Sequence, residues 1–322
     1  MSVLTALLNE QGFVVLDGGL ATELETRGES INHALWSAKI LLEKPEVIGD
    51  VHLAYFEAGA DVATTASYQA TFPGLAAQGL SKEQAEQVML RSVTVAAEAR
   101  ERFWSDGRNR VGRQRPLIAA SIGPYGAFLH DGSEYHGNYG VGYGDLKEFH
   151  RERLQLLAKS GADLLACESI PSLVEAKALA ELLRDLPDVP AWISFTCKDE
   201  GHISDGTAFA DAVTAVSAVS NVVAIGMNCT APKFVNALLE KAHSVTDKPL
   251  VAYPNSGELY DISTCGWKAT SEAGMIEEAA RGWLERGARL IGGCCRTTPE
   301  TITGIRKALS AAVFVPASSG SN

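Results

Sequence analysis

The sequence contains no apolar run that approaches the roughly 20 residues of a membrane-spanning helix. The N-terminus also lacks a basic region followed by an apolar stretch. Neither a transmembrane segment nor a signal peptide is therefore expected, which predicts a cytoplasmic protein. Disulfides are rare in that compartment, so the six cysteines are expected to bind metal or take part in catalysis.

Basic residues are also scarce. The chain has 28 Lys and Arg against 39 Asp and Glu, a net charge of −11, and its pI is about 5.2. This balance argues against nucleic acid as a partner and mildly favours a cationic substrate. The G-x-G-x-x-G loop of dinucleotide-binding folds is missing too, because the first expected strand is followed by DGGLAT at residues 17–22. Nucleotide cofactors therefore have no support in the sequence.

Eight short apolar runs recur along the chain, and each is typical of a strand buried on both faces. They are residues 13–16, 62–65, 117–120, 164–167, 192–195, 222–227, 250–253 and 290–291. Longer segments with helical spacing separate them. Eight strands that alternate with helices predict an α/β fold, a single-domain (β/α)8 TIM barrel. The alternative is an open doubly wound sheet.

Helix start and stop signals support this alternation. Ser81 and Gln84 form a capping-box pattern. Gly59, Gly161 and Gly287 each stand shortly before an expected strand, where a glycine ends a helix in the left-handed conformation. The barrel is expected over residues 1–315, and the Ser/Gly-rich tail 316–322 is expected to be disordered.

Thiols follow two of the expected strands. Cys229 comes after the sixth strand, and Cys294 and Cys295 come after the eighth. In a barrel the carboxyl ends of the strands meet at one face, and these two strands flank the seventh, so the thiols are expected to converge. Three thiolates that leave a fourth position open are the catalytic arrangement of Zn²⁺, not the structural one.

Other interpretations of the adjacent cysteines stay open. Free cysteines often pack as small hydrophobes, and a vicinal disulfide is a second alternative. A Gly292–Gly293 loop with Arg296 nearby is also typical of a barrel phosphate site, although that leaves the thiols unexplained. For zinc, the two glycines are expected to allow the tight turn that aims both thiols at one ion. The remaining cysteines are interpreted as packing residues: Cys167, Cys197 and Cys265.

Two carboxylates are expected at the same face. Asp17 ends the first strand and Glu168 ends the fourth. Such a pair could hold a substrate ammonium group or act as acid and base. A helix N-cap or a salt bridge is the alternative for either residue alone. Hydroxyl groups follow the neighbouring strands, and their alternative role is to satisfy loop backbone groups: Thr64, Thr65, Ser67 and Ser121.

Residues 128–144 are rich in glycine and carry Tyr135, Tyr139 and Tyr143. The segment is long for a connection between a strand and a helix, so it is either a substrate lid or a surface loop. Aromatic faces in it could hold a cation.

With these motifs in place, the sequence resembles the homocysteine S-methyltransferase family over about residues 10 to 310. The motifs are LDGG at 16–19, TTASYQ at 64–69, SIGPYG at 121–126, Glu168, GMNC at 226–229, YPNSGE at 253–258 and GGCCRTTP at 292–299. The last of these is highly specific. The resemblance implies a barrel enzyme with Zn²⁺ bound by Cys229, Cys294 and Cys295.

The resemblance further implies that Asp17 and Glu168 hold the amino-acid part of homocysteine, with Gly18 and Thr65 nearby. The implied partners are small molecules, homocysteine and a methyl donor. The DGSEY run at 131–135 is most similar to the S-methylmethionine branch, in which a sulfonium compound (S-methylmethionine or S-adenosylmethionine) methylates the homocysteine thiolate to form methionine. Betaine-dependent transfer, or a non-catalytic zinc or thiol barrel protein, is the alternative. The sequence indicates no oligomeric state.

Overall fold

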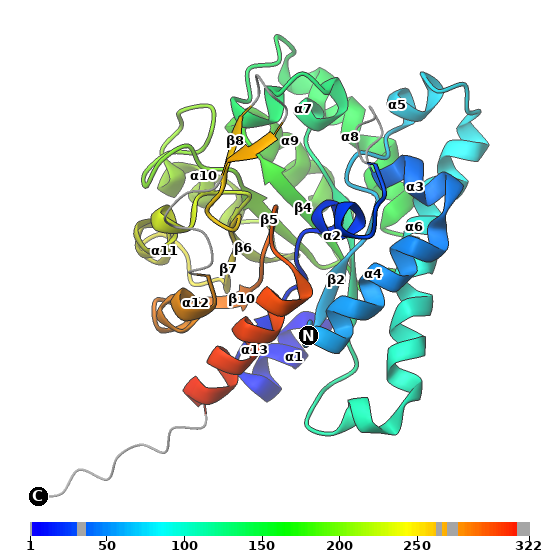
Figure 1. The fold of residues 1–322 in the computed structure, drawn as a ribbon. Coiled ribbons are helices and arrows are strands. Elements are labelled where there is room, and N and C mark those ends of the chain that lie inside the picture. Colours follow the sequence, from blue (N-terminus) through cyan, green and yellow to red (C-terminus); the bar gives the residue numbers. More distant parts are fainter. Residues whose placement is uncertain (1, 31–36, 262–265, 269–275, 314–322) are drawn as a thin grey trace, which may run out of the picture.

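The computed structural model describes residues 2–30, 37–261, 266–268 and 276–313. Eight parallel strands form one sheet in the order β1-β10-β7-β6-β5-β4-β3-β2 (Figure 1). They are β1 (Val14–Val15), β2 (Val62–Thr64), β3 (Leu117–Ile122), β4 (Leu164–Ile170), β5 (Ala191–Phe195), β6 (Val222–Asn228), β7 (Leu250–Tyr253) and β10 (Ala288–Ile291). A parallel bridge between Leu16 and Val62 joins the two edge strands. The sheet therefore closes, and the prediction of a TIM barrel is confirmed.

All eight expected strands are present. The largest difference lies at the carboxyl end of β4, which continues to Ile170 instead of ending at Cys167. A register shift between these two residues marks an irregularity in the pairing of β4 with β5. Such a bulge re-aims side chains at the end of a strand, and this one contains Glu168.

Helices follow the strands and surround the barrel (Figure 1). The α-helices are α1 (Val3–Gln11), α2 (Leu20–Thr26), α3 (Ser37–Glu43), α4 (Pro45–Ala58), α5 (Phe72–Ala76), α6 (Lys82–Ser105), α7 (Tyr125–Leu129), α8 (Tyr143–Leu157), α9 (Leu173–Arg184), α10 (Phe209–Ser217), α11 (Val235–His243), α12 (Ile276–Glu285) and α13 (Pro299–Val313). Short 3-10 turns are η1 (Gly107–Arg110), η2 (Ser133–Tyr135) and η3 (Pro232–Phe234). None of the helices in the described ranges is long and apolar enough to cross a membrane.

The predicted helix ends are confirmed except at Gly161. Ser81 and Gln84 form a reciprocal capping box at the start of α6. Gly59, Gly161 and Gly287 have φ angles of 114°, 86° and 97°. This left-handed region favours glycine. Gly59 is the C-cap of α4, and Gly287 lies two residues past the end of α12. Helix α8 already ends at Leu157 with Ala158 as its cap, so Gly161 turns the chain toward the next strand without ending the helix.

Helix α1 covers the amino end of the barrel. Leu4 and Leu7 of this helix belong to the same buried cluster as Val14, Val62 and Leu164, which are the first residues of their strands. In Figure 1 this helix lies low in the view, next to the N-terminus. The opposite end, where the strands finish, is therefore the end that is free to form a site.

A two-stranded antiparallel hairpin in the connection after β7 was not predicted. It consists of β8 (Leu259–Asp261) and β9 (Gly266–Lys268). Cys167 and Cys197 are buried in the apolar core, as predicted. Cys265 and the tail 316–322 lie outside the described residues, and the domain limit at residue 315 stays a prediction.

Candidate active site

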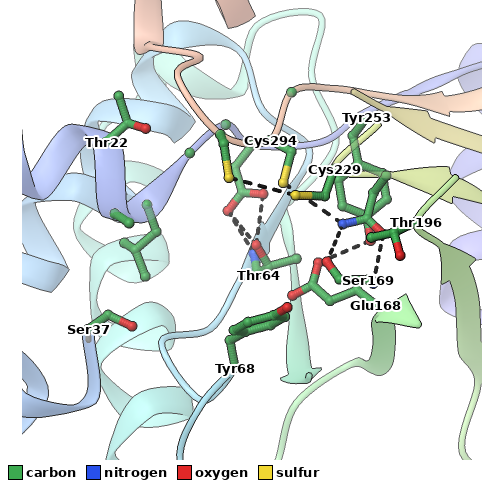
Figure 2. A pocket seen from close by; sticks show the side chains of 18 of the residues that line it. Thr22, Ser37, Thr64, Tyr68, Glu168, Ser169, Thr196, Cys229, Tyr253 and Cys294 are labelled. Carbon is green, nitrogen blue, oxygen red and sulfur yellow. Dashed lines mark hydrogen bonds between the residues drawn. The ribbon is translucent and has the colours of Figure 1, made fainter. Parts of the chain in front are cut away.

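The three predicted thiols converge at the carboxyl end of the barrel. Cys229 follows β6, and Cys294 and Cys295 lie in the loop after β10. The three sulfurs lie within 4.8 Å of one another, and Sγ of Cys229 is 3.8 Å from Sγ of Cys295. Figure 2 shows the sulfurs of Cys229 and Cys294 close together, with Thr64 below them and Tyr68 lower still in the view. All three cysteines are free thiols, so the vicinal disulfide is wrong.

Gly292 and Gly293 are needed for close packing. Neither has a φ angle in the left-handed region, so the expected reason for them, a tight turn that only glycine allows, is wrong. A Cβ on Gly292 would lie 2.6 Å from Cβ of Leu16, and one on Gly293 would lie 2.3 Å from Oγ1 of Thr297. The absence of a side chain at Gly292 lets the cysteine loop approach the end of the first strand, and its absence at Gly293 lets the loop fold back against Thr297.

The geometry does not support the phosphate interpretation of this loop. The N–H groups of Gly292 and Gly293 donate to the carbonyl oxygens of Ala252 and Asp17 at 3.2 and 3.1 Å. The guanidinium of Arg296 forms an ion pair with Glu258 and is not among the residues that line the pocket. Neither the amides nor the cation is left for a phosphate group.

Asn228 orients one of the sulfurs. Its side chain is completely buried. Oδ1 accepts hydrogen bonds from N of Ser169 at 2.7 Å and from Oγ of Ser194 at 2.8 Å. These contacts fix the amide so that Nδ2 lies 3.9 Å from Sγ of Cys294. The sequence analysis assigned no role to Asn228, although it stands between the end of an apolar strand and Cys229.

The thiol cluster fits a thiophilic metal. Zinc–sulfur bonds of about 2.3 Å require sulfurs separated by roughly 4 Å, which small side-chain movements achieve here. The pKa of each thiol lies well above its ordinary value: hydrogen bonds among the three thiols act in both directions, and burial raises the pKa of all three. A bound cation is what would hold all three as thiolates, and metal binding would release their protons.

Asp17 lies beside the thiols with its carboxylate almost fully buried. Oδ2 accepts a hydrogen bond from N of Thr64 at 2.8 Å, and Oδ1 accepts one from Oγ1 of Thr64 at 3.0 Å. Burial raises the pKa of Asp17 to about 8, against the opposing effect of the Thr64 hydrogen bonds, and the charge of Glu168 raises it further. The cap of α2 is Gly19, so the helix-cap alternative for Asp17 is wrong.

Glu168 lines the same pocket. The bulge of β4 places it there, and Ser169 beside it has a φ of 59°. Its carboxylate accepts hydrogen bonds from Oγ of Ser121 and from the hydroxyl of Tyr253, the latter at 3.0 Å. Burial raises the pKa of Glu168, although both hydrogen bonds act to lower it. Tyr253 therefore belongs to the site, a role that the sequence analysis did not assign.

The other expected substrate residues also line the pocket. Thr65 is buried, and its hydroxyl lies 2.7 Å from Oγ of Ser67 and accepts a hydrogen bond from N of Ser121. The hydroxyl that contacts Asp17 is therefore that of Thr64. Gly18 permits close packing, because a Cβ there would lie 2.8 Å from Cε1 of Tyr55.

Residues 128–144 form part of the pocket wall. The 3-10 turn η2 brings Glu134 and Tyr135 to the pocket. Among the described residues that line it, three are acidic and none is Lys, Arg or His. The pocket therefore suits a ligand that carries positive charge.

A parallel (β/α)8 barrel with three convergent thiols and buried carboxylates at the carboxyl ends of its strands defines a barrel enzyme whose site can hold a thiophilic metal. Residues 14–309 match the family model described as homocysteine S-methyltransferase. The chain belongs to this family and is a methyltransferase, which confirms the resemblance seen in the sequence.

Relatives and solved structures agree with this assignment. The chain is 52% identical over 305 residues to homocysteine S-methyltransferase YbgG of Bacillus subtilis, with 95% of this chain and 97% of that protein covered. It is 48% identical over 314 residues to homocysteine S-methyltransferase 3 of Arabidopsis thaliana, covering 93% and 90% of the two chains. The metallated form of the homocysteine methyltransferase MmuM from Escherichia coli superposes with a TM-score of 0.85 at 45% identity, covering 94% of this chain and 99% of that chain.

Proposed function

We propose that this homocysteine S-methyltransferase depends on Zn²⁺ held by Cys229, Cys294 and Cys295. We also propose that it takes its methyl group from a sulfonium donor, S-methylmethionine or S-adenosylmethionine, and forms methionine. The observation that carries the proposal is that the three sulfurs share one pocket with Asp17 and Glu168. A thiol barrel without catalytic function would have no use for these buried carboxylates.

The protein's part in activating the acceptor is to supply the metal ligands and fix their positions. Zinc at the three thiolates would hold the homocysteine sulfur as its nucleophilic thiolate. The buried amide of Asn228 orients Cys294 toward the cluster. Because the protein offers three ligands here, a bound zinc ion would keep a position open for the substrate.

Asp17 and Glu168 are proposed to bind the ammonium group of homocysteine. Burial raises the pKa of both groups, and a nearby ammonium would favour their ionised forms. Thr64 holds the carboxylate of Asp17 in place, and Tyr253 does the same for Glu168. Fixing the acceptor in this way contributes through positioning, which can supply on the order of 7–11 kcal/mol.

The transfer needs no general base once the acceptor is a thiolate. Its sulfur lone pair forms the new S–CH₃ bond, and the bond between the methyl carbon and the donor sulfonium breaks. The bonding electrons stay on the donor sulfur, which leaves as a neutral thioether. The acidic lining of the pocket favours this cationic kind of donor.

The test is methionine formation from homocysteine by reduced, zinc-replete protein with S-methylmethionine, S-adenosylmethionine or betaine supplied separately. The fastest turnover is expected with S-methylmethionine. Turnover with betaine alone would refute the proposed donor, and full turnover after complete removal of zinc would refute the role of the metal.

A further inference from the structure

One carboxylate in the pocket has no assigned role. Oε2 of Glu134 is buried and accepts no hydrogen bond from any described residue. Burial also raises the pKa of Glu134. A buried carboxylate oxygen without a hydrogen-bond partner is costly, and a ligand that enters the pocket would supply the missing partner.

Glu134 reaches the pocket from a different element than the proposed homocysteine carboxylates, because it stands on η2 whereas Asp17 follows β1 and Glu168 lies in β4. Burial, followed by the charge of Asp131, raises the pKa of Glu134. Asp17 is influenced instead by burial and by Glu168. The pocket therefore presents carboxylates from two kinds of element, Asp17 and Glu168 from the strand ends and Glu134 from η2.

The position of Glu134 is well defined by its surroundings. Helix α7 packs against η2 so closely that a Cβ on Gly126 would lie 2.4 Å from N of Glu134. Oδ1 of Asp131 accepts a hydrogen bond from N of Ser133 at 2.9 Å. After the turn, the hydroxyl of Tyr139 donates to Glu175 at 2.8 Å. The carboxylate is therefore presented by a fixed turn.

We infer that Glu134 binds the α-ammonium group of the methyl donor, an inference that rests on the proposed function. An ammonium group supplies both the N–H donor that Oε2 lacks and the opposite charge. A sulfonium centre has no N–H, and neither does the quaternary nitrogen of betaine. Glu134 thus selects sulfonium compounds that are also amino acids, and it acts in specificity rather than in the transfer step.

The experiment compares the parent enzyme with Glu134→Gln on two donors, S-methylmethionine and the dimethylsulfonio derivative of butyric acid, which is its deaminated counterpart. The specificity constant kcat/KM is measured for each donor that the enzyme turns over. If a donor is not turned over, its inhibition constant is measured instead. Glu134→Gln should lose about 10- to 100-fold with S-methylmethionine and nothing with the deaminated compound. This non-additivity is the signature of a direct contact. The KM for homocysteine and the zinc content should stay at the parent values.

Glu148→Gln is the matched control, because it removes a carboxylate from an exposed position on α8 and should behave as the parent. Three results for Glu134→Gln would overturn the inference but not the proposed function. They are equal losses of activity on both donors, no loss on S-methylmethionine, and a raised KM for homocysteine. A parent enzyme that is inactive with S-methylmethionine would overturn the proposed function and the inference with it.

Discussion

Asn228 and Cys294 stand 66 positions apart in the chain, yet Nδ2 of Asn228 lies 3.9 Å from Sγ of Cys294. The asparagine closes one strand of the barrel and the cysteine follows another. The contact links the core of the barrel to the thiol cluster, because the same amide is held by Ser169 and Ser194.

Replacing Asn228 by Asp should therefore weaken metal binding by about 10- to 100-fold. The substitution removes the N–H donor that faces the sulfur and introduces a negative charge there. Metal affinity is measured by competition with a chelator. Asn221→Asp is the control, since Nδ2 of Asn221 donates to the backbone at Leu183, away from the pocket. Equal metal affinity in the two variants would contradict the role of Asn228.

Cys295→Ser should lower the zinc content and abolish turnover, because the cluster loses one of its three thiolates. Zinc is measured by elemental analysis and turnover by methionine formation. Cys197→Ala removes a buried thiol outside the cluster and should keep its metal. A zinc-free Cys295→Ser enzyme with parental activity would exclude the proposed mechanism.

Glu168→Gln should weaken homocysteine binding by about 10- to 100-fold while zinc stays bound, since it removes a charged partner of the ammonium group. Binding is measured by calorimetry with zinc-replete protein. Tyr253→Phe should cause a smaller loss, because Ser121 still donates to the Glu168 carboxylate. Unchanged homocysteine affinity in Glu168→Gln would remove this residue from its role.

The raised pKa of Asp17 predicts a pH-dependent stability. The folded state holds a proton on Asp17 up to about pH 8, whereas the unfolded chain releases it near the ordinary value of 3.8. The free energy of unfolding attributable to this group therefore falls as the pH rises between these values. Asp17→Asn removes that dependence. The free energy of unfolding of the variant minus that of the parent should therefore increase by a few kcal/mol as the pH rises from 3.8 to about 8.

Urea unfolding of the reduced, metal-free protein at several pH values measures the Asp17 effect. Asp50→Asn is the control, because Asp50 is exposed and pairs with Arg102 at the surface; its difference from the parent should stay flat. An Asp17→Asn protein whose stability relative to the parent does not rise with pH would contradict the prediction.

Gly293→Ala should disturb the thiol cluster, since the added methyl would lie 2.3 Å from Oγ1 of Thr297. We expect reduced zinc content together with a lower melting temperature. Gly107→Ala is the control, because it adds the same methyl group where no atom lies within 4 Å. Its zinc content and its melting temperature should stay at the parental values. Parental zinc content in Gly293→Ala would show that the loop can move without disturbing the ligands.

The positions of the strands could be predicted because each is a short apolar run between helical segments. Their order in a parallel barrel then predicted that thiols far apart in the sequence would meet. The hairpin β8–β9 was missed, since short antiparallel pairs inside a long connection leave little pattern. The bulge that carries Glu168 was missed for a related reason, because a register shift depends on the neighbouring strand.

Side-chain contacts within the site were harder to predict. Thr64 and Thr65 are adjacent, and the family resemblance implied a place near the substrate for Thr65 alone, yet the hydroxyl of Thr64 is the one that reaches Asp17. Which of two neighbouring residues faces a carboxylate depends on strand pairing and twist rather than on residue type.

The sequence by itself determined the class of fold and the face on which Cys229, Cys294 and Cys295 lie, because alternating strands and helices place all carboxyl strand ends together. Only the tertiary structure decided how the cysteine loop packs against the first strand and which groups orient the sulfurs. It also showed that Oε2 of Glu134 has no hydrogen-bond partner among the described residues. Those features depend on distances between side chains remote in sequence, which periodicity and composition do not fix.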